Sequence, residues 1–142
     1  MRKFIISIDA GTTSNRAILF DLKGKPIFSS QKEFTQFFPK SGWVEHNPEE
    51  IWNTTKKVLK DVILKAKKFR GKILTIGITN QRETTVLWDK KTGKTVYRAI
   101  VWQDRRQADY CKKLKNQNKE TLIFNKTGLP IDSYFSGTKI KW

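Results

Sequence analysis

Two apolar segments on either side of a short polar turn constrain the fold of this chain more than any other feature. Residues 4–8 form the first segment, residues 17–21 form the second, and Asp9-Ala10-Gly11-Thr12-Thr13-Ser14-Asn15-Arg16 lies between them. Apolar runs of this length beside a glycine turn are typical of paired β-strands. The pattern predicts a hairpin whose first strand is buried on both faces and whose tip is crowded with polar groups.

The residue types at this tip suit a phosphate group and a metal ion. Gly11 lets the backbone turn tightly and approach a ligand, and successive turn amides can form an anion-binding concavity. Asp9 could hold Mg²⁺ directly or through water. Hydroxyl groups and a guanidinium add donors for phosphate oxygens: Thr12, Thr13, Ser14 and Arg16. An ordinary hairpin, whose aspartate and threonines bond only their own turn, is the alternative that spacing alone leaves open.

The composition indicates a folded globular chain with a strong positive charge. Its 142 residues are 37% hydrophobic and 12% aromatic, which is enough to build a core. The formal charge of +16 raises the question of nucleic-acid binding. The lysines are spread over helix faces and turns, without zinc-ligand spacing, an aromatic RNA-binding signature or a basic recognition helix. We interpret the charge as solvated surface and keep a basic nucleic-acid-binding module only as the distant alternative.

Single copies of cysteine and histidine exclude two classes of site. Cys111 has no partner for an internal disulfide, and with His46 it cannot make a tetrahedral metal site. The apolar run after Met1 is too short for a secretory signal because Asp9 interrupts it, and no run approaches transmembrane length. We expect a cytoplasmic protein without a membrane partner, in which His46 has a structural or surface role.

The clearest helix is predicted directly after residue 47. Asn47 is a favourable N-cap, Pro48 suits the first helical position, and Glu50 stands three residues after the cap, as in a capping box. Mostly apolar residues then recur at helical spacing: Ile51, Trp52, Thr55, Val58, Leu59, Val62, Ile63, Ala66 and Phe69. We expect this stripe, Trp52 included, to pack against the sheet, and Gly71 to stop the helix.

A strand expected at residues 72–78 leads into a second polar cluster at residues 79–83. Sheets of α/β proteins place ligands just past the carboxyl ends of buried strands. Arg82 and Glu83 offer donors and acceptors for a polyol, whose hydroxyls both give and take hydrogen bonds. A surface ion pair between these two side chains is the alternative.

The rest of the chain predicts a third strand at residues 27–34, a hairpin of residues 84–88 and 95–102, and two helices. Residues 103–106 are expected to cap the first helix, and the second runs from residue 120 to a stop at Gly128. Ile140 and Trp142 open a further helical stripe without a stop signal. We therefore expect this sequence to be an amino-terminal portion of a longer protein.

Five segments together resemble a known family. They are residues 9–16, Gly42-Trp43-Val44-Glu45-His46, Gly77-Ile78-Thr79-Asn80-Gln81-Arg82-Glu83-Thr84-Thr85, Ala99-Ile100-Val101-Trp102-Gln103 and Tyr134-Phe135-Ser136-Gly137-Thr138-Lys139. The chain resembles the amino-terminal part of FGGY carbohydrate kinases over essentially its whole length, and most closely the members that phosphorylate glycerol. The resemblance implies an α/β fold: the first lobe of an actin-like, ribonuclease H-like ATPase, with a mixed sheet and flanking helices. Residues 1–142 would form one amino-terminal domain, truncated at its carboxyl end and lacking the second lobe.

The resemblance also implies ATP-dependent phosphorylation of glycerol to sn-glycerol 3-phosphate, with ATP and Mg²⁺ as cofactors. The residues that would meet the nucleotide phosphates are Thr12, Thr13, Ser14 and Arg16. Asp9 would lie near Mg²⁺, Arg82, Glu83 and Tyr134 would bond the glycerol hydroxyls, and Trp102 would pack against the glycerol carbons. In this family the general-base aspartate and the adenosine pocket come from later sequence. No catalytic residue is therefore expected in this chain, nor activity from the 142 residues alone.

Two positions depart from the glycerol-phosphorylating members. Those members usually carry glutamine at the position of Ala10 and proline at the position of Ser133. We expect Ala10 to remove a polar side chain beside the phosphate turn, and Ser133 to loosen the approach to Tyr134. A related kinase for another polyol or sugar is the near alternative, and the sequence leaves open whether the complete protein is a homo-oligomer.

Overall fold

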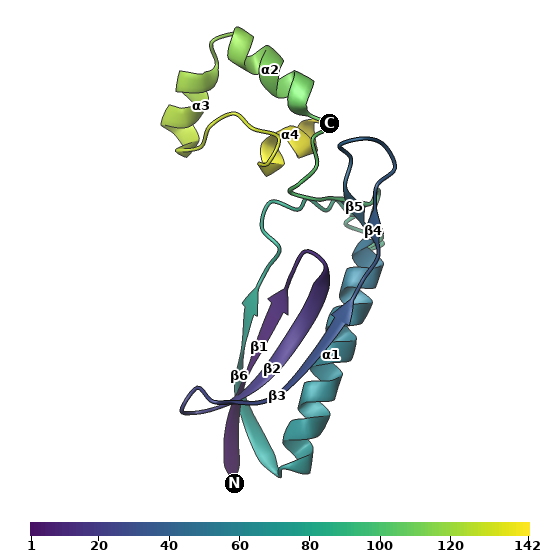
Figure 1. Ribbon diagram of the computed structural model, residues 1–142, viewed down its shortest axis with the longest axis vertical. Coiled ribbons are helices and arrows are strands. Elements are labelled where there is room, and N and C mark those ends of the chain that lie inside the picture. Colours follow the sequence, from purple (N-terminus) through teal and green to yellow (C-terminus); the bar gives the residue numbers. More distant parts are fainter. The chain divides into compact units, whose positions relative to one another are not determined.

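The computed structural model describes residues 1–142 and divides into two compact units. The sheet unit consists of Met1–Thr35 and Asn47–Gln81, and the second unit consists of Gln36–His46 and Arg82–Trp142. The elements of the sheet unit (Figure 1) are β1 at Arg2–Ala10, β2 at Ser14–Asp21, β3 at Pro26–Glu33, α1 at Pro48–Lys68 and β6 at Gly71–Thr79. The strand order is β3-β2-β1-β6, with β6 parallel to β1 and the other pairs antiparallel. The predicted hairpin, third strand and helix are confirmed.

One face of this sheet packs against α1 and carries the core. The core combines alternate residues of β1 and β2 with the inner stripe of the helix: Phe4, Ile6, Ile8, Ala17, Leu19, Val58, Val62 and Ala66. Ile5 and Ser7, which point to the opposite face, are only half-buried. The prediction that residues 4–8 are buried on both faces is therefore wrong, because the sheet unit has a single helix and it covers one face.

The start of α1 is capped differently from the predicted capping box. Asn47 is the N-cap, and its Oδ1 accepts a hydrogen bond from Glu49 N at 3.0 Å. The Glu50 carboxylate is engaged elsewhere: its Oε1 accepts from the backbone N and the Oγ1 of Thr35, both at 3.1 Å. Glu50 thus ties the first turn of the helix to the segment that follows β3.

The buried stripe of α1 is narrower than the sequence predicts. Its buried positions recur at every fourth residue: Thr54, Val58, Val62 and Ala66. Trp52 is 57% exposed, and the Lys56 ammonium lies 5.3 Å from the centroid of its ring. The prediction that Trp52 packs on the sheet is wrong, because the step of two positions from Trp52 to Thr54 corresponds to about 200° of rotation around a helix.

The end of α1 shows why residue 71 is glycine. The helix ends at Lys68, and Arg70, not Gly71, adopts the left-handed conformation, with φ 50°. Gly71 is the first residue of β6, where a Cβ would overlap the buried ring of Phe4. The helix therefore ends close to the predicted residue, but Gly71 does not end it. Glycine is needed at position 71 because β6 lies very close to the Phe4 side chain.

The second unit contains a small three-stranded sheet, in which β4 at Gln36–Phe37 and β7 at Ala99–Ile100 flank β5 at Glu45–His46. The predicted hairpin of residues 84–102 keeps its turn, where Gly93 N donates to Asp89 O at 2.8 Å. Isolated bridges take the place of its long strands. The predicted strand at residues 95–102 is reduced to β7 because that segment pairs with β5.

Three short helices complete this unit: α2 at Ala108–Asn116, α3 at Glu120–Thr127 and α4 at Ser136–Lys141. As predicted, α3 ends at Gly128, which is left-handed with φ 71°. Residues 103–106 do not cap α2, whose N-cap is Gln107. Asp104 is instead buried and accepts from Val44 N at 2.7 Å, far away in the sequence. No helix in the structure has both the length and the apolar composition needed to cross a membrane.

We predict that Gly71→Ala lowers the free energy of unfolding by about 1–3 kcal/mol, because the added methyl group forces Phe4 out of a packed position. Gly77→Ala in the same strand is the matched control, since a Cβ there meets no atom within 4 Å. Urea unfolding of the two purified variants measures the difference. Equal stability of both variants would show that the Phe4 ring relaxes without cost.

Candidate functional site

The tip of the β1–β2 hairpin is a tight turn closed by its own backbone. Gly11 N donates to Ser14 O at 3.0 Å. A Cβ on Gly11 would lie 2.9 Å from the same oxygen, so only glycine fits without a shift of the backbone. Phe34 N donates to Thr13 O at 3.2 Å and holds the tip from the β3 side. The hydroxyl residues Thr12, Thr13 and Ser14 therefore stand on a turn of defined shape.

Polar side chains gather on the sheet face opposite α1, beside this turn. Arg16 pairs in register with Asp9 on one side and with Gln31 on the other. The Arg16 guanidinium donates through Nε and Nη2 to Gln31 Oε1 at 3.1 and 2.8 Å. Gln31 Nε2 in turn donates to Ser14 Oγ at 2.8 Å. The structure thus brings the five predicted residues of this turn together, with Gln31 as a member that sequence reasoning missed.

Asp9 lies between two strands whose polar ends meet. Its register partners are Arg16 in β2 and Thr79 at the end of the parallel strand β6. The side chain of Asp9 is exposed, and no group of three or more His, Cys, Asp or Glu residues in the structure could hold a metal ion by itself. Mg²⁺ characteristically takes one or two carboxylates and completes its shell with phosphate oxygens and water. A single exposed aspartate beside a turn rich in hydroxyl groups fits that donor set.

Asn15 anchors the tip to the helix and was not identified from the sequence. It is fully buried, and its Nδ2 donates to Ile51 O at 2.9 Å and to Thr54 Oγ1 at 2.6 Å. Its Oδ1 is buried without a hydrogen-bond partner. The available signal was the alternation of β2, since Asn15 occupies the same inward-facing set as Ala17 and Leu19. An amide among inward-facing apolar residues needs a specific partner.

Arg82 and Glu83, the two residues of the second predicted cluster that were expected to bind a polyol, lie in the second unit. Glu83 has a left-handed backbone with φ 60°, which is uncommon for a residue with a side chain. Its Oε2 accepts from both the backbone N and the Oγ of Ser136, at 2.8 Å each. The Glu83 carboxylate therefore bonds Ser136, and the surface ion pair with Arg82 considered from the sequence is not formed. Arg82 itself is exposed.

Two aromatic side chains of the same prediction are in contact. The rings of Trp102 and Tyr134 meet edge to face, with centroids 5.7 Å apart, and Tyr134 also meets Phe135 at 5.1 Å. Tyr134 N donates to Asp132 Oδ1 at 2.7 Å. Because Ser136 bonds Glu83 and lies two residues after Tyr134, the carboxylate and the ring pair belong to one local arrangement. Ser133, where we expected a looser approach to Tyr134 than proline would give, is buried, and its Oγ accepts from Arg105 Nη1 at 3.1 Å.

A buried ion network in the second unit was not predicted. The Arg106 guanidinium donates to Glu45 Oε1 and Asp104 Oδ2, both at 2.8 Å, and lies over the rings of Trp43 and Trp142. Burial opposes its charge, but the hydrogen bonds to the two carboxylates outweigh burial and raise the pKa of Arg106. The network holds residues 43–45 against residues 104–106, so we interpret it as structural.

His46 is structural, in agreement with the prediction. The side chain is fully buried, and Nε2 lies 2.5 Å from Gln36 Oε1 across the β4–β5 pair. This position gives His46 a role in joining the two short strands.

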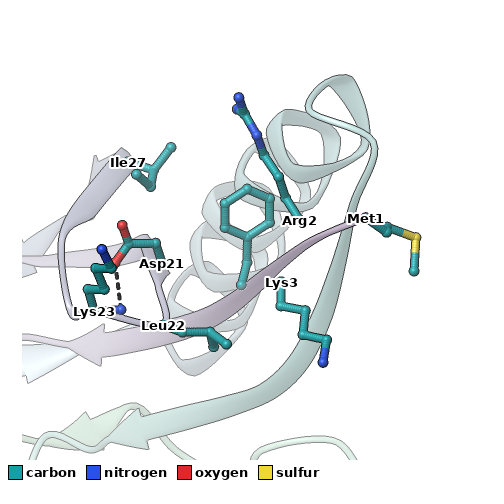
Figure 2. A pocket seen from close by; sticks show the side chains of 8 residues that line it. Met1, Arg2, Lys3, Asp21, Leu22, Lys23 and Ile27 are labelled. Carbon is teal, nitrogen blue, oxygen red and sulfur yellow. Dashed lines mark hydrogen bonds between the residues drawn. The ribbon is translucent and has the colours of Figure 1, made fainter.

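A hollow of about 490 Å³ opens at the end of the sheet unit away from the hairpin tip (Figure 2). It is lined by the start of β1 and the β2–β3 turn: Met1, Arg2, Lys3, Phe4, Asp21, Leu22, Lys23 and Ile27. The Asp21 carboxylate is used by that turn, since its Oδ1 accepts from Lys23 N at 2.8 Å and from Lys25 N at 3.0 Å. The hollow shares no residue with the predicted phosphate site.

The sequence from residue 4 to residue 142 matches the N-terminal domain of the FGGY family of carbohydrate kinases. The chain belongs to this family. The glycerol kinase of Alkaliphilus metalliredigens is 59% identical over 142 residues, which are all of this chain and 28% of that protein. The glycerol kinase of Oceanobacillus iheyensis is 60% identical over 140 residues, again with 28% of its length covered. The chain therefore spans little more than a quarter of these FGGY relatives.

Solved FGGY kinases share the fold. Plasmodium falciparum glycerol kinase, solved with ADP, matches 99% of this chain with a TM-score of 0.91 and 35% identity, and 28% of that chain is covered. A gluconate kinase from Lactobacillus acidophilus matches with a TM-score of 0.91 and 26% identity. The predicted family and the predicted α/β fold of a sugar-kinase first lobe are confirmed.

Replacing Asn15 with alanine should lower the free energy of unfolding by about 1–3 kcal/mol, because the buried partners on α1 lose their donor. Gln31→Ala is the matched control: it removes a hydrogen-bonding amide from β3, the strand paired with β2, on the exposed face of the sheet. It should change the free energy of unfolding by less than about 0.5 kcal/mol. Urea unfolding compares the two variants. An Asn15→Ala protein as stable as the Gln31→Ala protein would rule out the anchor.

Proposed function

We propose that this chain is the amino-terminal domain of an ATP-dependent glycerol kinase, which transfers a phosphoryl group from ATP to glycerol and yields sn-glycerol 3-phosphate. The observation that supports binding of the acceptor is the arrangement around Glu83. Its carboxylate stands on a left-handed backbone and bonds Ser136, two residues after Tyr134, whose ring contacts Trp102. Strained backbone conformations concentrate where a side chain must be aimed at a ligand. The identity to glycerol kinases over the whole chain supports the same acceptor.

The hairpin tip is proposed to bind the nucleotide phosphates. Its backbone is fixed by Gly11 and by the Asn15 anchor, so the donors need little reordering when phosphate binds. The proposed phosphate ligands are Thr12, Thr13, Ser14 and Arg16. Asp9 would hold Mg²⁺, which would neutralise charge on the phosphates when bound. The ADP in the related Plasmodium falciparum structure supports a nucleotide as the ligand.

The acceptor residues are proposed to make polar contacts with the hydroxyl groups of the polyol and an apolar contact with its carbon chain. Arg82 donates to a hydroxyl, Glu83 accepts from one, and the Tyr134 hydroxyl can do either. Trp102 offers an apolar surface for the carbon chain. The general base that takes the proton of the attacking hydroxyl is assigned to an aspartate outside residues 1–142, so these residues bind and orient the acceptor and are not catalytic. Residues 1–142 are proposed as one domain of the enzyme.

A kinase for another polyol or sugar is the second candidate. The gluconate kinase and a xylulose kinase from Lactobacillus acidophilus have the same fold at 26% identity each, with TM-scores of 0.91 and 0.90. The discriminating experiment compares glycerol, gluconate and xylulose as acceptors for the full-length protein, with ATP and Mg²⁺. We predict the highest kcat/KM with glycerol, and a higher value with either other acceptor would favour the second candidate.

In the full-length protein, Arg82→Ala and Glu83→Gln should each lower kcat/KM for glycerol about 10- to 100-fold, while KM for ATP stays unchanged. The reason is the loss of one charge-assisted hydrogen bond to a hydroxyl, which contributes about 1.5–3 kcal/mol. Glu120→Gln on α3, an exposed carboxylate far from the acceptor residues in the sequence, is the matched control. Wild-type kinetics with glycerol in both variants would remove these two residues from the site.

A further inference from the structure

Lys139 is a buried lysine that bonds only backbone. Its exposed fraction is 2%, although it lies on the short helix α4 between half-buried Thr138 and exposed Ile140. Its Nζ donates to Ser133 O at 2.8 Å, to Tyr134 O and to Phe135 O at 3.3 Å. An ammonium has three protons and no acceptor. All three donors are used by three consecutive carbonyls, so none is left for a ligand.

The three carbonyls belong to the segment that carries the acceptor residues. Tyr134 contacts Trp102, and Ser136, which follows Phe135, supplies both hydrogen bonds to the Glu83 carboxylate. Consecutive carbonyl groups that converge on one point repel one another unless a cation lies between them. The Lys139 ammonium therefore stabilises the backbone conformation of residues 133–135, in the segment that carries Tyr134 and Ser136.

The surroundings of Lys139 act on its charge in opposite directions. Burial lowers the pKa of Lys139, while the carboxylates of Glu83, Asp104 and Asp132 act in the opposite direction. The three carbonyl oxygens also favour the ammonium form, because hydrogen bonds to a charged donor stabilise the charge. An apolar residue of similar length would fill the space but would take the ammonium donor away from all three carbonyls, of which Phe135 O would keep the hydrogen bond from Thr138 Oγ1 at 3.5 Å.

We propose that Lys139 is a positioning residue of the acceptor site: it holds the 133–136 backbone so that Tyr134 and the Ser136–Glu83 pair face glycerol correctly. This inference rests on the proposed function. It assigns Lys139 a role without contact to glycerol, ATP or Mg²⁺, which distinguishes it from a lysine that binds phosphate. A phosphate-binding lysine would affect the nucleotide, whereas Lys139 acts on the acceptor through its neighbours.

The test measures KM for glycerol and KM for ATP separately in the full-length protein. Lys139→Met should raise KM for glycerol about tenfold or more and leave KM for ATP within about twofold. The substitution displaces the side chains proposed to bind glycerol and leaves those proposed to bind the ATP phosphates in place. Lys139→Arg keeps the charge but not the geometry of three convergent bonds, so it should give a smaller rise. Lys141→Met, an exposed lysine two residues along the same helix, should behave as wild type.

A double-mutant cycle separates positioning from a general loss of structure. Ser136→Ala removes one of the two donors to Glu83 and should itself raise KM for glycerol. If Lys139 acts through Ser136, the effects of Lys139→Met and Ser136→Ala should be less than additive. Lys139→Met and Thr13→Ala, which alter different proposed sites, should be additive.

The outcomes distinguish this inference from the proposed function. Wild-type protein that does not phosphorylate glycerol overturns the proposed function and the role of Lys139 with it. Active wild-type protein together with an unchanged KM for glycerol in Lys139→Met overturns the role of Lys139 alone, as does an equal rise in both KM values. If Lys139→Met does not fold, Lys139→Arg and Ser136→Ala decide: wild-type KM for glycerol in both overturns the inference.

Discussion

The packing of α1 against one face of β1 and β2 is the interaction on which the sheet unit depends. Val58, Val62 and Ala66 are fully buried against the inward residues of the two strands. Burial of each large aliphatic side chain contributes about 1.5–3 kcal/mol, so this layer supplies most of the apolar stabilisation of the unit. It also decides the chemistry of the other face. Because the strand alternates, burying one set of side chains places Asp9 and Arg16 together on the opposite side.

The second unit depends on buried cations. Arg106 joins Glu45 to Asp104, and Lys139 gathers three backbone carbonyls. A buried ion pair contributes little net stability, since desolvation offsets attraction, but removing one partner is costly. Such groups therefore define one arrangement of short, irregular segments that apolar packing alone would leave loosely specified. The proposed acceptor residues lie on these irregular segments, whereas the proposed phosphate residues lie on a hairpin supported by a core.

The sequence by itself determined the family, the main elements and the residue types of both proposed sites. The hairpin of residues 4–21, the Asn47 cap and the helix end at Gly128 all follow from local rules, and the structure agrees with each. Local rules work here because strand periodicity, capping and positive φ involve residues only a few positions apart. The motifs at residues 9–16 and 77–85 carried the resemblance for a related reason: each is contiguous in the chain.

Only the tertiary structure decided which partner each polar side chain takes. Glu50 bonds Thr35 in place of its own cap, the Asn15 amide bonds α1, and Glu83 bonds Ser136, 53 residues away. Helical periodicity likewise did not show that Trp52 is exposed, because the buried width of a helix depends on what packs against it. The burial of Lys139 is the clearest case, since no local rule shows that this lysine of the 134–139 segment is buried while Lys141, two residues on, is exposed. Its partners are defined by the path of the backbone, and that path exists only once the unit has folded.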